Sequence, residues 1–244
     1  MSVRYLSCGD TAFTVEFGNE ISPGINGQVM ALHGAIGVAK AGGELAGVVE
    51  TVPTMRSLMV TYDPLVTSRA LLQPRIDALI AGGLSAGGTT RQVRIPCCYD
   101  DPDFAPDLAE VAERTKKTPE QVIADHLGSA FKLYVLGFMP GLAYIAGLEP
   151  SLYLPRRSQP RVRVPRSSVA IAMDMTTIYP FESPGGWHLL GRTPLLMFDQ
   201  RREQPVFLAP GDRLTFERID RATYDGIAAH AEAGTLDWAT LVKT

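Results

Sequence analysis

Proline and glycine interrupt the sequence at short intervals from residue 132 to residue 212, and this spacing limits what that part of the chain can form. Proline in a helix interior removes a backbone hydrogen bond and clashes with the preceding turn, so no helix of ordinary length fits between these residues. The segments between them are short and apolar, which is typical of strands joined by turns. We expect an all-β barrel or sandwich here, with irregular loops that carry any binding site. The interrupting residues are Pro140, Gly141, Pro150, Pro155, Pro160, Pro165, Pro180, Pro184, Gly185, Gly186, Pro194, Pro205, Pro210 and Gly211.

A run of small residues at positions 82–88 is the best candidate for a domain boundary. Its residues have little apolar surface to bury and high backbone freedom, which is typical of linkers. A chain of 244 residues is long enough for two small domains. We therefore expect a first domain at residues 1–85 and a second at residues 90–244.

The first domain begins with a strand pattern and a helix pattern. Apolar and polar or small residues alternate over residues 13–17, as in a strand with one buried face. Ser22 suits a helix N-cap and Pro23 the first helical position, and apolar residues at helical spacing follow up to Ile36. These patterns predict a strand followed by a helix.

Two more strands and a second helix complete the predicted first domain. Residues 47–52 and 57–62 read as strands separated by a turn. A helix lies somewhere in residues 68–81, but its start is open, because Pro74 would kink a helix begun at residue 68 and would suit a first turn near Gln73. The order of strand, helix, strand, strand, helix predicts an α+β domain of ferredoxin-like type.

Two short helices are predicted near the start of the second domain. Apolar residues share one face over residues 106–114, and residues 118–121 match a capping box with proline at the first helical position. The second helix is expected at residues 119–127. His126 lies on its apolar face in the last turn, where a packed core histidine is favoured over a catalytic base.

Five arginines and no acidic residue occupy residues 155–166. If residues 161–164 are extended, Arg161 and Arg163 point to the same side of the strand. Two guanidinium groups on one face suit a carboxylate or a phosphate. The alternative is a solvated strand face on which the arginines only keep an edge soluble.

The segment Ser183-Pro184-Gly185-Gly186-Trp187 could form an anion-binding bend. Paired glycines allow backbone N–H groups to face one point, and the indole would wall the site. The alternative is a tight turn without a ligand. The later Gly191-Arg192-Thr193 gives a spacing that resembles a phosphate-binding loop, but such a loop leads into a helix, whereas here Pro194 and a strand-like segment follow.

Composition excludes several classes of protein. The formal net charge is −3, so no global field favours nucleic acid or an anionic membrane, and no apolar run is long enough to span a membrane. The three cysteines form neither a disulfide framework nor a metal-binding pattern, and the histidines lack metal spacing. We expect a cytoplasmic protein without a metal site, a nucleic-acid partner or a membrane partner.

Motifs dispersed over nearly the whole chain resemble those of the 5-oxoprolinase B-subunit family, which is also called allophanate hydrolase subunit 1 or carboxyltransferase domain, subdomain C/D. The motifs are Gly9-Asp10, Val49-Glu50-Thr51-Val52-Pro53, Ser57-Leu58, Tyr62-Asp63-Pro64, Gly137-Phe138-Met139-Pro140-Gly141-Leu142-Ala143-Tyr144, the pair Pro155-Arg156 and Pro160-Arg161, Ile178-Tyr179-Pro180, Ser183-Pro184-Gly185-Gly186-Trp187, Gly191-Arg192-Thr193-Pro194 and Pro210-Gly211-Asp212.

The resemblance implies a ferredoxin-like domain followed by a cyclophilin-like β-barrel. It also implies a homologous partner, the 5-oxoprolinase C-subunit or allophanate hydrolase subunit 2, and a complex that uses ATP to hydrolyse a lactam or amide C–N bond, as in the conversion of 5-oxoproline to glutamate. The chain alone is expected to be inactive.

The family resemblance also implies a groove in the second domain. Its arginines would neutralise a substrate carboxylate or an ATP phosphate, and the amides of Gly185 and Gly186 would hold an oxyanion. The residues expected to line it are Tyr144, Arg156, Arg161, Tyr179, Ser183, Gly185, Gly186, Trp187 and Arg192.

Two segments depart from the family pattern, at residues 166–169 and 173–177. Glycines and a glutamine that the family usually has are replaced there, which changes hydrogen bonding beside the groove. The substrate can therefore be another amide, lactam or urea-like compound. Two further alternatives stay open, namely a regulatory inhibitor of a histidine kinase and a component of a urea-type carboxyltransferase.

Overall fold

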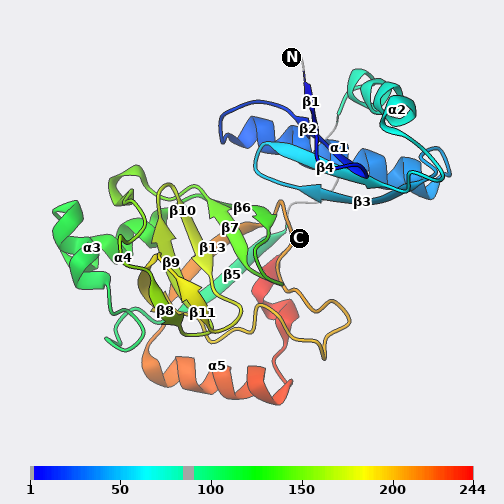
Figure 1. Cartoon of the computed structure of the whole chain (residues 1–244). Helices are drawn as coiled ribbons and strands as arrows, with labels where there is room; N and C mark the ends of the chain where they lie inside the picture. Colours follow the sequence, from blue (N-terminus) through cyan, green and yellow to red (C-terminus); the bar gives the residue numbers. More distant parts are fainter. Residues whose placement is uncertain (1–2, 85–90, 244) are drawn as a thin grey trace. The chain divides into compact units, whose positions relative to one another are not determined.

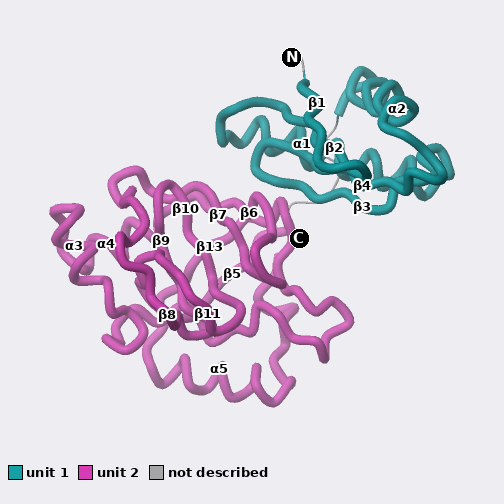
Figure 2. The backbone as a smooth tube through the Cα atoms, in the orientation of Figure 1, with its two compact units in different colours: residues 1–89 teal, residues 90–244 magenta. Residues whose placement is uncertain are grey.

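The computed structural model describes residues 3–84 and 91–243. The chain divides into two compact units, residues 1–89 and residues 90–244 (Figure 2). Most of the glycine-rich segment predicted as a linker falls in residues 85–90, outside the described residues.

Unit 1 is a four-stranded antiparallel sheet with two helices (Figure 1). The strand order is β1-β2-β4-β3. As predicted, the Ser22 hydroxyl caps the first helix by accepting a hydrogen bond from the Ile25 N–H at 3.2 Å. Phe13, Leu58 and Leu32 are fully buried between sheet and helices. The elements are β1 Arg4–Ser7, β2 Ala12–Glu16, α1 Pro23–Ala41, β3 Val48–Pro53, β4 Ser57–Tyr62 and α2 Arg69–Ala81.

The predicted order of strand, helix, strand, strand and helix is confirmed for unit 1, with one strand added at its start. The added strand β1 pairs with β2 along its whole length. Helix α2 begins at Arg69 and contains Pro74. It tolerates the proline because only one intrahelical bond is lost, the bond to the carbonyl of Ala70. The specific ferredoxin-like description stays a prediction.

Unit 2 contains an eight-stranded sheet of order β12-β9-β10-β7-β6-β13-β5-β14 and a two-stranded sheet of β11 and β8. The strands are β5 Gln92–Cys97, β6 Phe131–Leu136, β7 Ala143–Ala146, β8 Arg161–Val164, β9 Ser168–Ala172, β10 Met175–Ile178, β11 Ser183–Gly185, β12 His188–Arg192, β13 Arg213–Arg218 and β14 Val242–Lys243. The helices are α3 Leu108–Thr115, α4 Pro119–Gly128 and α5 Arg221–Ala233, with 3₁₀ turns η1 Pro150–Leu152 and η2 Trp238–Leu241.

The middle of unit 2 is free of α-helix, as the proline and glycine spacing predicts. Between α4 and α5 the described chain holds strands, loops and one 3₁₀ turn. Helix α5 follows the last Pro-Gly pair and was not predicted. Its local signals were present, since the Asp220 carboxylate caps its start by accepting from the Thr223 N–H and Gly234 ends it in a left-handed conformation.

The large sheet of unit 2 curls, but its ladders do not close among the described strands. Strand β12 lies at one edge and β14 at the other. A single bridge, in which Cys98 and Arg192 exchange backbone hydrogen bonds of 2.9 and 3.0 Å, joins β12 to the chain just after β5. The structure is therefore a mixed α/β fold without a closed barrel, and the cyclophilin-like description stays a prediction.

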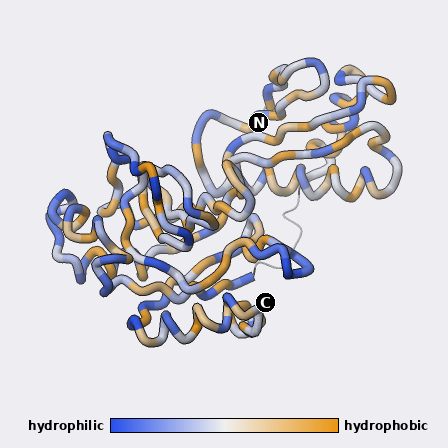
Figure 3. The backbone as a smooth tube through the Cα atoms, turned by 60° about the horizontal axis from the view of Figure 1, so that its bottom comes forward, coloured by the Kyte–Doolittle hydropathy of each residue, from blue (hydrophilic) through white to orange (hydrophobic). Residues whose placement is uncertain are grey.

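Hydrophobic residues concentrate along the strands of both units, and hydrophilic residues gather at turns and loops (Figure 3). No helix among the described residues has both the length and the apolar character needed to cross a membrane.

His126 is a core residue, as predicted. Its side chain is fully buried, with Nδ1 2.9 Å from the Tyr99 hydroxyl and Nε2 3.2 Å from Thr176 Oγ1. Thr176 donates its own proton to the Ala170 carbonyl, so Nε2 carries the imidazole proton and Nδ1 accepts from Tyr99. Burial lowers the pKa of His126 to about 3, which keeps the ring neutral in this network.

Candidate functional site

The arginine-rich segment and the Pro-Gly-Gly-Trp segment form one short ladder. Strand β11 pairs antiparallel with β8, which places Gly185 opposite Arg161 and Ser183 opposite Val164. Beyond the ladder, the backbone N–H of Arg157 donates to the Gly186 carbonyl at 2.7 Å. The two segments therefore build one surface, although residues 167–182 lie between them in the sequence.

Tyr179 lies beneath this ladder. Burial raises the pKa of Tyr179 to about 12, although the nearby positive charge of Arg156 lowers it. A Cβ atom at Gly185 would overlap this hydroxyl and lie 2.9 Å from Tyr179 Cζ. Glycine at position 185 is therefore required by the close approach of the phenol.

Apolar side chains pack around Tyr179. Tyr144 on β7 and Trp187 just before β12 make an edge-to-face contact with ring centroids 6.3 Å apart. Both pack against a small buried cluster that includes Leu142, Val164, Ala170, Tyr179 and Leu189. Met139, in the turn between β6 and β7, packs against the same cluster.

A buried carboxylate holds the guanidinium of Arg161. Asp107, the residue before α3, accepts from Arg161 Nη1 and Nη2 at 2.8 and 2.5 Å. It also accepts from Arg157 Nη1 at 3.0 Å and from the Leu189 backbone N–H at 2.7 Å. Arg157 reaches Glu110 at 2.7 Å as well. The charges of Arg157 and Arg161 are thus balanced inside the protein.

Arg163 does not share the partner of Arg161. It forms an exposed bidentate pair with Glu182, at 2.9 and 3.0 Å. Asp107, Glu110 and Glu182 all come from outside residues 155–166, and they pair Arg157, Arg161 and Arg163 although that segment contains no acidic residue.

Arg156 is the exception in this group. Its side chain is exposed and makes no hydrogen bond or ion pair with any residue that the structure describes. A Cβ atom at Gly186 would lie 3.7 Å from Arg156 Nε and Nη2, so the guanidinium extends along the glycine. Together with its effect on the Tyr179 pKa, this contact places an uncompensated positive charge beside the phenol.

The Ser183 hydroxyl and the His188 imidazole are two further polar groups near the site. The Ser183 hydroxyl is buried and has no hydrogen-bond partner among the described residues. His188, which the sequence did not single out as a site residue, is fully buried and lies with Nε2 3.0 Å from the Pro155 carbonyl. A carbonyl only accepts, so Nε2 donates and thereby fixes the start of the arginine-rich segment. The sequence around His188 gives no signal of this contact, because Pro155 lies far from it in the chain.

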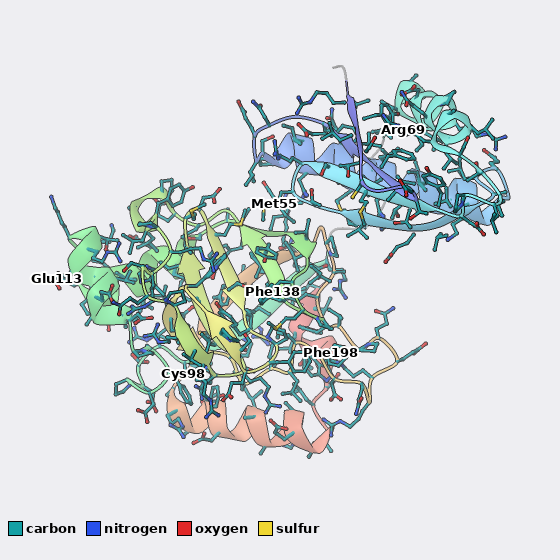
Figure 4. All side chains as sticks on the ribbon, in the orientation of Figure 1. Met55, Arg69, Cys98, Glu113, Phe138 and Phe198 are labelled. Carbon is teal, nitrogen blue, oxygen red and sulfur yellow. The ribbon has the colours of Figure 1, made fainter. Side chains whose placement is uncertain are left out.

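Arg192 lies at the other end of β12, about 13 Å along the strand from His188. Its Cζ sits 4.5 Å from the centroid of the Phe104 ring, and its positive charge lowers the pKa of Tyr224 on α5, which burial raises. Cys98 pairs with Arg192, and Phe138 is the residue before Met139. Figure 4 shows these two labelled residues, Cys98 and Phe138, in different parts of unit 2. The structure thus brings eight of the nine expected residues to the β8–β11 ladder and the cluster beneath it, whereas the Arg192 guanidinium packs on Phe104 instead. Those eight are Tyr144, Arg156, Arg161, Tyr179, Ser183, Gly185, Gly186 and Trp187.

Within residues 3–84 and 91–243, no group of three or more histidine, cysteine, aspartate or glutamate side chains is placed to hold a metal ion.

The sequence pattern of the carboxyltransferase domain, subdomain C and D, matches residues 3–208, and the chain belongs to this family. Among its relatives is the 5-oxoprolinase B-subunit of Bacillus subtilis, which is 35% identical over 240 residues that cover 92% of this chain and 97% of that protein.

Two longer proteins also contain a region similar to this chain. The crystal structure of TTHA0988 is 37% identical and superposes with a TM-score of 0.75, covering 90% of this chain and 40% of that one. Urea amidolyase of Lachancea kluyveri is 25% identical over 268 residues, which cover 91% of this chain and 14% of that protein.

Proposed function

We propose that this chain is one component of an ATP-dependent complex that hydrolyses a lactam or amide C–N bond, with 5-oxoproline as the first candidate substrate. Membership of the family and likeness to the 5-oxoprolinase B-subunit support this proposal. Within the complex, the chain binds the carboxylate of the substrate at Arg156, in the segment before β8. We also propose that unit 1 is ferredoxin-like, that unit 2 is cyclophilin-like and that the protein is cytoplasmic.

The observation that carries the proposal is the guanidinium of Arg156, which has no hydrogen-bond or ion-pair partner among the described residues. Its neighbours Arg157 and Arg161 are neutralised by Asp107 and Glu110. The local excess of positive charge therefore resides on Arg156, which can grip a carboxylate through two hydrogen bonds.

Tyr179 supplies a second contact in this proposal. Its phenolic O–H can donate to a ligand oxygen. A pKa raised to about 12 keeps that proton in place at neutral pH. The Ser183 hydroxyl and the amides of Gly185 and Gly186 are further candidate donors on the same ladder.

The residues of this site do not fit ATP. Among the described residues here, only Arg156 has a free positive charge, whereas a triphosphate carries several negative charges. Residues 186–193, whose spacing resembles a phosphate-binding loop, contain strand β12 and do not open a helix. We therefore assign ATP to the homologous partner, the C-subunit, and propose that this chain is inactive without it.

The test compares Arg156→Met with Arg163→Met in the complex reconstituted with the partner proteins. Loss of a charge-assisted contact worth about 1.5–3 kcal/mol predicts that Arg156→Met lowers kcat/KM for 5-oxoproline about 10- to 150-fold, mainly through KM. Arg163, whose ion pair with Glu182 is exposed, is the matched control and should stay within about twofold. Equal activity of the two variants would remove Arg156 from substrate binding.

The likeness to urea amidolyase supports a second candidate, a component of a urea-type carboxyltransferase. The same reconstituted complex, assayed with urea and allophanate in place of 5-oxoproline, separates the two. Turnover with urea and none with 5-oxoproline would replace the first proposal by the second.

A further inference from the structure

Unit 2 contains a cavity of about 370 Å³ on elements other than those of the candidate site. It is lined by Arg91 before β5, by the loop that carries Arg202 and Phe207, and by Trp238 in η2 and Val242 in β14. This volume lies in the range of small-molecule sites.

Aromatic rings and a stacked arginine form one wall of the cavity. The rings of Phe207 and Trp238 contact each other with centroids 4.6 Å apart. The guanidinium of Arg202 lies over the indole of Trp238, with Cζ 4.3 Å from the ring centroid. This wall combines apolar surface with positive charge.

The two arginines of the cavity differ in how their charge is balanced. Arg91 makes a bidentate pair with Asp212, at 2.8 and 2.5 Å, and also donates to the Phe207 carbonyl. Arg202 donates from Nη2 to the carbonyls of Pro205 and Met197, at 2.7 and 3.3 Å. Only Arg91 has a carboxylate partner among the described residues.

Two nitrogens of Arg202 remain unused. Nε and Nη1 are buried and have no hydrogen-bond partner among the described residues. The nearby Asp199 is held by Arg201 through contacts of 2.9 and 2.7 Å. Glu203, which also lines the cavity, makes no ion pair with either of its arginines. Burial lowers the pKa of Arg202, as expected for a cation without a counter-ion.

We propose that this cavity binds a small organic carboxylate with an apolar body, a ligand distinct from the substrate of the candidate site. The ligand carboxylate balances the charge of Arg202, which has no carboxylate partner among the described residues, and the apolar body packs against Phe207 and Val242. A partly buried cation without a counter-ion costs free energy, and an anionic ligand in the cavity offsets that cost.

Tryptophan fluorescence of the full chain tests the proposal. The chain has two tryptophans, so Trp187→Phe leaves Trp238 as the only reporter. In that background, cyclohexanecarboxylate should change the emission saturably, and its neutral analogue cyclohexanemethanol should not. Arg202→Gln should weaken the response at least tenfold, whereas Arg94→Met, at an exposed pair with Glu217, should leave it unchanged.

A second variant guards against a misfolded Arg202→Gln protein. Ala239→Met fills the cavity and keeps the arginine, so it should also abolish the response. A response to cyclohexanemethanol equal to that for the acid, or equal binding in Arg202→Gln, would overturn the proposal. A response to inorganic phosphate as strong as that to the acid would overturn the assignment of an apolar carboxylate.

Discussion

The two ends of strand β12 use arginine in opposite ways. At the end near His188, internal carboxylates take Arg157 and Arg161 and leave Arg156 open to a ligand. At the other end, Arg192 stacks on Phe104, and Arg221 approaches the same ring with Cζ at 4.8 Å. The comparison teaches that an arginine within a motif can bind a ligand, position a neighbour or pack on a ring, and that its surroundings decide which.

Asp107 is the residue that separates these roles. It is buried, and it accepts from two guanidinium groups and from the backbone of β12. Arg161 is thus a positioning residue in our interpretation, since it ties the ladder of β8 and β11 to the start of α3. Arg156 is exposed and has no such carboxylate partner among the described residues.

The largest expected effect comes from Asp107→Ala. The change leaves two half-buried guanidinium groups without their carboxylate, and we expect a loss of about 3–5 kcal/mol in the free energy of unfolding. Urea denaturation followed by circular dichroism measures it. Glu110→Ala is the control, because its side chain is 42% exposed, and it should cost less than about 1 kcal/mol. Similar losses for both variants would contradict the central role of Asp107.

A smaller effect is expected from Gly185→Ala, which tests how tightly Tyr179 is packed. The added methyl would overlap the Tyr179 hydroxyl, so we expect a destabilisation of about 1–3 kcal/mol and weaker substrate binding. Gly186→Ala is a matched control, since its Cβ would meet atoms no nearer than 3.7 Å. Thermal denaturation of both variants gives the comparison, and equal melting temperatures would refute the packing argument.

The smallest effect is expected from Arg192→Met, at the far end of β12. Loss of the stacking on Phe104 should reduce stability by about 1 kcal/mol, while KM for the substrate stays unchanged. Arg156→Met should show the reverse, with stability within about 0.5 kcal/mol of the parent and a raised KM. If Arg192→Met raises KM as much as Arg156→Met, the two ends of β12 act together and the contrast fails.

Local sequence signals predicted the capped helix starts well. The Thr118 hydroxyl accepts from the Gln121 N–H at 3.2 Å, and the Gln121 side chain accepts from the Thr118 N–H at 2.8 Å, as the capping-box pattern predicts. Such contacts join residues three apart, so the sequence contains everything they need. Strand β1 gave no such signal, because it is short and its pairing with β2 defines it.

The sequence by itself determined several local conformations: the capped starts of α1 and α4, the segments where proline and glycine forbid helices, and the strand residues that face inward. It also contained the family motifs that gather around Tyr179. Only the tertiary structure decided which arginine is free, because Asp107 lies 50 residues from Arg157 in sequence and 54 from Arg161. The reason is physical, since charge compensation depends on distance and burial in space, and neither is written in the order of neighbouring residues.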